Sequence, residues 1–144
     1  MRNSKFEIRN EGRFSLKRKS LKGMVVINNL IEVKSFDFAV TIVNLYKHLT
    51  TDKKEFILSK QLLRSGTSIG ANVSEAEKAP SDADFNAKMN IALKEANESF
   101  YWLRLLHETE YLTDKEFESM EADIKEIISI LVSITKSMKN KSNK

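Results

Sequence analysis

The stretch TDKEFESMEADIKEIISILVSITKSM, residues 113–138, decides the fold. Its large apolar residues recur at alternating steps of three and four, at Phe117, Met120, Ile124, Ile127, Leu131, Ile134 and Met138. Such a seam is typical of a helix in a left-handed helix bundle. Thr113 and Glu116 form a capping box, which marks where the helix begins. We therefore expect a helix over residues 114–139 whose central seam, from Ile124 to Ile134, is buried.

Two more helices are predicted upstream of this stretch. The segment 82–111 opens with Ser81 as a cap and repeats its apolar residues at threes and fours. The segment 54–78 opens with a capping pattern that places Glu55 in the first turn. It should end before Pro80, because the residue ahead of a proline disfavours the helical region.

A first helix is predicted over residues 34–50, with an unusually wide apolar arc. One stripe of this arc contains Phe36, Val40, Val43 and Leu49, and a second beside it contains Phe38, Ile42 and Leu45. An arc of this width indicates a bundle helix with much of its surface covered. No segment has a strand pattern, and the chain has only four Gly and one Pro.

Four amphipathic segments with short links predict an all-α fold, an antiparallel up-down-up-down four-helix bundle. The bundle is expected over residues 31–140. Residues 1–30 are predicted to form a basic, flexible extension, and residues 141–144 a frayed tail.

The charge of the chain is concentrated at its start. Residues 1–23 hold eight Lys or Arg and two Glu, a net charge of +6, which leaves −2 for the remainder of a chain that totals +4. Cations with interleaved aromatic residues suit nucleic-acid phosphates and bases. Alternatively, these residues are a solvated tail, or translation begins at Met24. The candidate RNA, DNA or partner contacts are Arg13, Lys17, Arg18 and Lys19, followed on the bundle by Lys60 and Arg64.

Side chains for catalysis or metal binding are sparse. The absence of cysteine excludes disulfides and thiolate metal sites. A di-metal carboxylate bundle needs Glu three residues before each His, but Leu45 and Arg104 precede His48 and His107 at that spacing. We interpret His48 as exposed and His107 as a surface partner of Glu110. The sequence therefore predicts no enzyme, no metal and no cofactor.

Two carboxylates leave one catalytic alternative open. Glu75 and Glu98 are conceivable as an acid–base pair. The competing interpretation is polar pairing with Arg64 or Asn72 at a junction inside the bundle or between subunits.

The chain has no apolar run near the roughly 18 residues that a membrane span needs. Its basic start also lacks the apolar core of a secretory signal. We therefore expect a cytoplasmic protein that does not contact a membrane.

Gly66 and Gly70 lie four residues apart within a predicted helix, where each costs about 1 kcal/mol relative to alanine. With Ser74 they form a ridge of small residues that lets another backbone approach closely. We expect this ridge to pack inside the bundle, where Ala92 and Ala96 of the third helix would suit it, or at a subunit junction. Asn72, Glu75 and Glu98 are assigned to the same junction.

Residues 61–77, QLLRSGTSIGANVSEAE, resemble the signature of the bacterial four-helix-bundle family of 23S rRNA intervening-sequence proteins. That signature reads Gln-Leu-x-Arg, a run of small residues, Ser-Ile, and Ala-Asn-Ile-x-Glu. It is matched by Gln61, Leu62, Arg64, Ser68, Ile69, Ala71, Asn72 and Glu75. Residues 34–49 and 85–112 resemble the first and third helices of the family. The sequence departs from it at Ala76, where Gly is common, and at Lys94-Glu95, where a Gly-Ser pair is common.

The resemblance implies a homo-oligomer, in particular a pentameric ring, without an established enzyme activity. The related accessory variability determinants of diversity-generating retroelements form similar pentamers that bind a reverse transcriptase and nucleic acid. A non-enzymatic scaffold or adaptor for RNA or a protein partner is therefore the leading hypothesis. The alternatives are an accessory subunit of a retroelement reverse transcriptase and an enzyme with an unrecognised carboxylate site.

Surplus apolar residues also favour assembly. The third helix carries four of them beyond its core stripe, at Ile91, Tyr101, Trp102 and Leu105. Exposed apolar patches of this kind mark interfaces. If they meet the glycine ridge of another copy, the contact joins unlike faces, and such contacts close into rings when the rotation allows.

Overall fold

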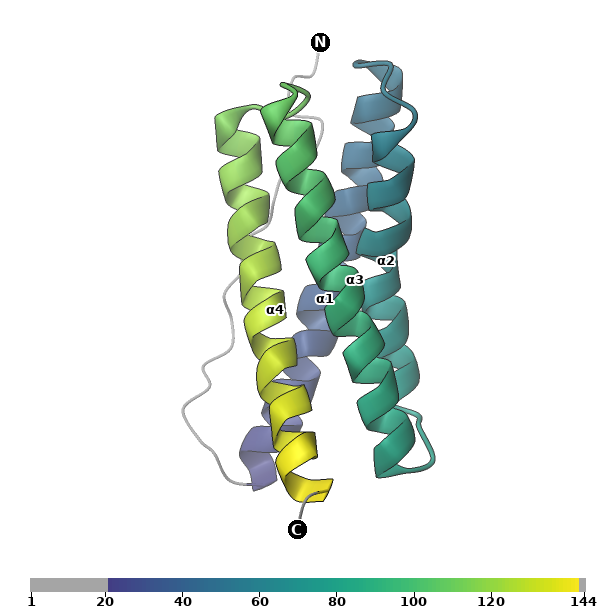
Figure 1. Ribbon diagram of the computed structural model, residues 1–144, viewed down its shortest axis with the longest axis vertical. Helices are drawn as coiled ribbons and strands as arrows, with labels where there is room; N and C mark the ends of the chain where they lie inside the picture. The colour runs from purple at the N-terminus through teal and green to yellow at the C-terminus, as the bar shows by residue number, and fades with distance from the viewer. Residues whose placement is uncertain (1–20, 143–144) are drawn as a thin grey trace.

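The computed structural model describes residues 21–142, which form four helices joined by short links (Figure 1). These helices are α1 (Leu21–Thr51), α2 (Leu58–Ala76), α3 (Asp82–Glu108) and α4 (Asp114–Ser142). Within the described range there is no strand. Each helix packs closely against the next along the chain, and α1 also packs against α4, whereas the backbones of the diagonal pairs do not approach each other closely. The predicted all-α, antiparallel four-helix bundle is therefore confirmed.

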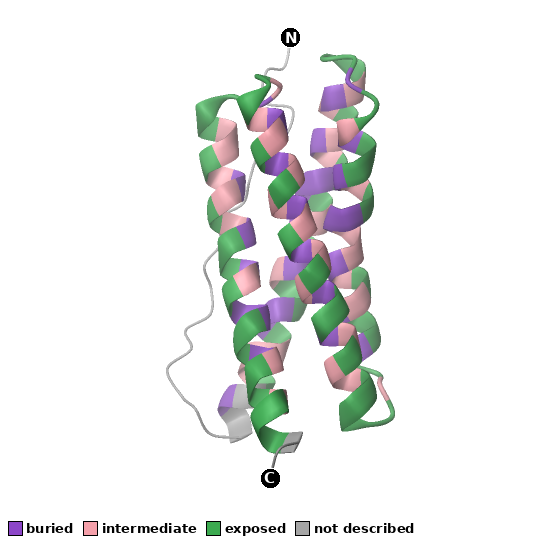
Figure 2. Ribbon diagram, in the orientation of Figure 1, coloured by how far each residue is buried: buried purple, intermediate pink, exposed green. Residues whose placement is uncertain are grey.

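The core runs along the inward faces of all four helices, as Figure 2 shows. On α4 the predicted seam is confirmed, since Ile124, Ile127, Leu131 and Ile134 are each no more than 2% exposed. On α3 the buried set repeats at threes and fours, with Met89, Ala92, Ala96, Ser99, Leu103 and Leu106. Burial of these apolar side chains is the main favourable term in the stability of the bundle.

Two of the predicted helix starts are confirmed in atomic detail. The Ser81 hydroxyl accepts a hydrogen bond of 3.1 Å from the backbone N–H of Asp84. At α4, the Glu116 N–H donates to the Thr113 hydroxyl at 3.1 Å, and the Glu116 carboxylate accepts from the Thr113 N–H at 2.9 Å. This reciprocal pair is the capping box that the sequence predicted.

The start of α2 differs from the prediction. The helix begins at Leu58 rather than 54, and Glu55 lies ahead of it instead of inside its first turn. The Glu55 carboxylate is buried and accepts hydrogen bonds from the N–H groups of Ile57, Leu58 and Ser59 at 2.6–3.1 Å. Burial alone would raise the pKa of Glu55, but these donors outweigh it and lower the pKa. An acidic side chain thus performs the capping.

The predicted boundaries of the first and last helices are too narrow. α1 begins at Leu21, so residues 21–30 are helical rather than part of a flexible extension. The physical reason is that the apolar period continues toward the N-terminus: Leu30 is buried in the core and Ile27 packs against it. Likewise α4 continues to Ser142, so the predicted tail is helical at its first two residues. Residues 1–20, with four of the candidate nucleic-acid contacts, lie outside the described residues.

The wide apolar arc of α1 is only half buried. Its second stripe, with Phe38, Ile42 and Leu45, faces the core, and Leu49 joins it. The first stripe is exposed, because the side of α1 away from α3 has no neighbouring helix. We call the exposed set, which lies within an arc of roughly 80°, the outer α1 stripe; it consists of Val25, Val33, Phe36, Val40 and Val43.

Candidate functional site

The glycine ridge of α2 packs against α1 and not against α3. A Cβ atom added to Gly66 would lie 2.9 Å from Cγ1 of Ile42, closer than real Cβ atoms approach. A Cβ atom on Gly70 would lie 3.2 Å from the backbone oxygen of Ser35. The two alanines of α3 suggested as partners are instead buried elsewhere in the core. Gly66 and Gly70 therefore serve the close approach of α1 and α2 within one chain.

The exposed end of the ridge opens into a shallow groove of about 320 Å³ between α1 and α2. Its lining consists of Glu32, Val33, Phe36, Asp37, Gly70 and Ser74. Ser74 is exposed at this end. The groove thus combines an apolar strip with two carboxylates and contains no cationic side chain among its lining residues.

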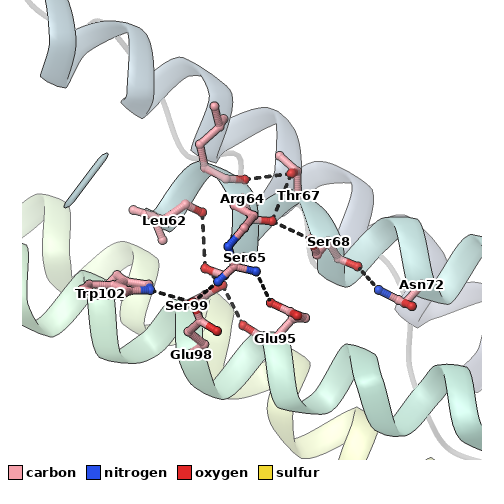
Figure 3. A network of polar contacts seen from close by, with 11 residues as sticks. Leu62, Arg64, Ser65, Thr67, Ser68, Asn72, Glu95, Glu98, Ser99 and Trp102 are labelled. Carbon is pink, nitrogen blue, oxygen red and sulfur yellow. Dashed lines mark hydrogen bonds and ion pairs between the residues drawn. The ribbon is translucent and has the colours of Figure 1, made fainter. Parts of the chain in front are cut away.

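The opposite side of α2 meets α3 through a polar junction, drawn in Figure 3. We use this name for Arg64, Ser65, Glu95, Glu98, Ser99 and Trp102. The Arg64 guanidinium donates to Glu95 at 3.2 Å and also to Glu98. The indole N–H of Trp102 donates to the same Glu98 carboxylate at 3.0 Å. One arginine therefore joins two carboxylates of α3, one of which is also held by a tryptophan.

Beneath these charged groups lies a pair of serines. The hydroxyls of Ser65 and Ser99 are hydrogen-bonded to each other at 2.9 Å, and both residues are fully buried. Buried hydroxyl groups need such partners, because an unpaired one loses its hydration without compensation. The small side chains also let α2 and α3 approach closely at this height.

The other residues assigned to the junction do not converge with it. The Asn72 amide donates to the Ser68 carbonyl of its own helix at 2.8 Å. Glu75 pairs with Lys88 at 2.6 Å, eleven residues along α2 from Arg64. At 1.5 Å per residue this separates Glu75 from Glu98 by roughly 16 Å. The two carboxylates are too far apart to share a proton or a substrate bond as an acid–base pair.

The two bundle cations singled out from the sequence have different surroundings. Lys60 is exposed on α2. The charge of Arg64 is already balanced by its two carboxylate partners, which leaves it less available to a phosphate. The sequence pointed to the pairing of Arg64 with Glu98, but it indicated Trp102 only as a surplus apolar residue and not as a hydrogen-bond partner of Glu98. It did not indicate the junction residues Ser65, Glu95 and Ser99. The missed signal was the four-residue spacing of Glu98 and Trp102, which brings side chains together on one helix face.

The histidines form local pairs. His107 contacts Asp114 at 2.7 Å and stacks on Phe117, so its predicted pairing with Glu110 is wrong. His48 contacts Asp52 at 2.9 Å. Among residues 21–142, no three His, Cys, Asp or Glu side chains gather as they would around a metal ion.

Carboxylates also gather where α1 meets α4. Burial is the main cause of the raised pKa of Asp123, about 6; Lys34 opposes the rise, and the carboxylates of Glu126 and Asp37 add to it. Lys34 pairs with Glu126 at 3.0 Å. Near the groove, burial and the neighbouring Glu32 carboxylate raise the pKa of Glu77. The outer stripe is therefore flanked by carboxylates on both sides, by Glu32 on the side of α2 and by Asp37 on the side of α4.

These features define a class of protein: an all-α bundle whose second helix presents glycines to one neighbour and a polar junction to the other. A family model described as 23S rRNA-intervening sequence protein matches residues 28–133, and the chain belongs to this family.

A solved structure agrees with this fold. A crystal structure of a protein of unknown function from the S23 ribosomal protein family, from Bacteroides thetaiotaomicron VPI-5482, is 59% identical. The similarity covers 76% of this chain and 98% of that chain, with a TM-score of 0.75. A comparison with curated proteins finds no match. Within the part of the chain that the structure describes, none of the helices combines the length and apolar character that crossing a membrane would require.

Proposed function

We propose that this protein is a non-enzymatic, homo-oligomeric scaffold or adaptor that holds an RNA or protein partner. The observation that carries the proposal is the outer α1 stripe. Phe36 is 67% exposed, and four valines on the same face are each more than a third exposed. From Val33 to Val43 this face of α1 is apolar without interruption, and such a patch is typical of an interface rather than of a free surface.

Assembly explains why this stripe is apolar. The core of the chain is complete without it, since α1 buries its opposite face. Water-exposed valine and phenylalanine gain free energy when a second surface covers them. The resemblance to pentameric relatives favours five copies.

The chemistry of the polar groups supports a binding role over a catalytic one. Glu75 and Glu98, the candidate acid–base pair, are separated along the bundle, and each is paired with a cation. The apolar and acidic groove suits a binding surface. A nucleic-acid partner would be bound through the basic start of the chain, because the remainder has a net charge of −2. A reverse transcriptase is one protein partner that the resemblance favours.

Light scattering on the full chain tests the assembly. We expect a mass several times the 16.5 kDa of one chain at micromolar concentration, with five copies as the favoured number. A mass of one chain at that concentration would refute the homo-oligomer.

A second measurement tests the nucleic-acid partner. Binding of a fluorescent single-stranded RNA is compared between the full chain and a chain that lacks residues 1–23, across a range of salt concentrations. We expect the deletion to weaken binding and to flatten its salt dependence. Equal affinity and slope in both chains would place any RNA contact on the bundle, and the absence of binding in both would favour a protein partner.

A further inference from the structure

A second exposed stripe lies on α3, diagonally across the bundle from the outer α1 stripe. Ile91 is 41% exposed and Tyr101 is 54% exposed, ten residues apart, with the exposed Lys94 between them. We call these three residues the outer α3 stripe. Because α1 and α3 are diagonal helices whose backbones do not approach each other closely, the two stripes lie on opposite corners of the bundle.

The two stripes stand at the same height along the bundle. Gly70 of α2 lies against Ser35 of α1. On the other side of α2, Arg64 pairs with Glu95 and Glu75 pairs with Lys88. Gly70 lies between these two ion pairs, so Ser35 is level with α3 near residue 91.

The two stripes also match in direction and length. α1 and α3 run the same way in the bundle (Figure 1). The segment from Val33 to Val43 and the segment from Ile91 to Tyr101 each span ten residues, roughly 15 Å. A second copy placed beside the first, pointing the same way and without an axial shift, therefore brings one stripe against the other.

The charges on the two stripes are complementary. Glu32 and Asp37 flank the outer α1 stripe, and neither forms an ion pair with a described residue. Lys34, close to them, is already paired with Glu126. Lys94 on the outer α3 stripe likewise has no ion-pair partner among residues 21–142. Pairing two α1 stripes with each other would instead bring like carboxylates together, at a cost in free energy.

From these observations we infer that the copies join through a contact between unlike faces, the outer α1 stripe of one copy against the outer α3 stripe of the next. This inference rests on the proposed homo-oligomer and names its interface. In this register Phe36 packs against Ile91 of the neighbour, and Tyr101 of the neighbour lies near the height of Val43. Lys94 of the neighbour lies between them and faces the acidic flanks that contain Glu32 and Asp37. A contact of this type leaves one free stripe on each outer copy, so it repeats from copy to copy, and it closes into a ring where the rotation between neighbouring copies allows.

The test uses light scattering on full-length variants, each checked for native helicity by circular dichroism. Phe36→Ser should raise the concentration at half assembly by about a hundredfold, and Lys94→Glu by about tenfold. The matched controls are Phe56→Ser, at another exposed phenylalanine before α2, and Lys60→Glu, at an exposed lysine of α2. Both controls should assemble like the native chain.

A charge exchange between the two stripes tests for a recovery of assembly, so the result does not depend only on variants that lose it. The double variant Glu32→Lys with Asp37→Lys should assemble as poorly as Lys94→Glu, and the triple variant that combines all three substitutions should recover assembly. If the native chain assembles while Phe36→Ser and Lys94→Glu remain assembled, the inferred interface is wrong and the homo-oligomer stands. Equal dissociation of the controls, or no recovery in the triple variant, also contradicts it. A native chain that is monomeric would refute the proposed homo-oligomer itself.

Discussion

α1 is held on its two sides by different means. Against α2 the contact is one of shape, because Gly66 and Gly70 bring the two backbones together around Ile42 and Ser35. Against α4 the contact involves fewer residues, and it includes carboxylates that interact with the same lysine, Lys34. The difference shows that one helix can combine a contact that should ignore pH and salt with one that should respond to both.

The largest expected effect is on the α2 side. Gly66→Leu adds a side chain where even a Cβ atom would press on the branched side chain of Ile42. We expect it to lower the free energy of unfolding by about 3 kcal/mol, as overpacking does in a tight core. Urea unfolding at pH 5 and pH 8 should give the same loss at both values.

Ala71→Leu is the matched control for this substitution. It adds the same bulk at an exposed position of the same helix and should change stability by less than about 0.5 kcal/mol. Equal losses from the two substitutions would mean that the close approach of α1 and α2 is not what the glycines serve.

A smaller effect of opposite sign is expected on the α4 side. The pKa of Asp123 is about 6 in the folded chain, against an ordinary value of 3.8. The folded state therefore binds more protons than the unfolded state between these values, and stability falls as the pH rises through this window. Asp123→Asn removes the fall and should stabilise the chain by about 1 kcal/mol at pH 8, after allowance for solvent screening at a partly exposed carboxyl.

Unfolding of the native chain and of Asp123→Asn across pH 3 to 8 measures this effect. The stability difference should grow between about pH 4 and pH 7 and stay constant above. A difference that does not change with pH would show that the carboxyl is not strained by its surroundings.

The smallest effect concerns the lysine shared by these carboxylates. Lys34→Met should destabilise the chain at pH 8 by about 0.5 kcal/mol, because the pair with Glu126 is partly exposed. It should also raise the pKa of Asp123 further, which NMR titration of the Asp123 carboxyl would detect. An unchanged pKa would mean that Lys34 does not act on Asp123.

Much of the fold could be predicted because its signals are local. The seam of α4 and the caps at Ser81 and Thr113 each involve residues close in sequence, and their geometry follows from helix periodicity alone. Glu55 was misplaced because a capping pattern does not distinguish a carboxylate inside the first turn from one that lies ahead of it.

The candidate surface was harder to predict. The exposed and buried stripes of α1 are both apolar, so periodicity cannot tell Phe36 from Phe38. Only the positions of the neighbouring helices decide which is covered. For the same reason the sequence indicated that Gly66 and Gly70 pack closely but not which helix they pack against.

The buried serine pair has a consequence for alignment. Ser65 has Leu62 and Ile69 one turn away on either side along the same face of α2. If α3 shifted along α2 by one turn, about 5.4 Å, Ser99 would face Leu62 or Ile69 instead of Ser65. Its hydroxyl would then lose its partner, and the larger side chain would not fit between the two helices. The serine pair therefore fixes the axial register of α3 relative to α2. A ring built from the outer stripes of α1 and α3 is flat only if the two stripes lie at the same height. Two buried hydroxyl groups, far from the interface, would therefore keep such a ring flat.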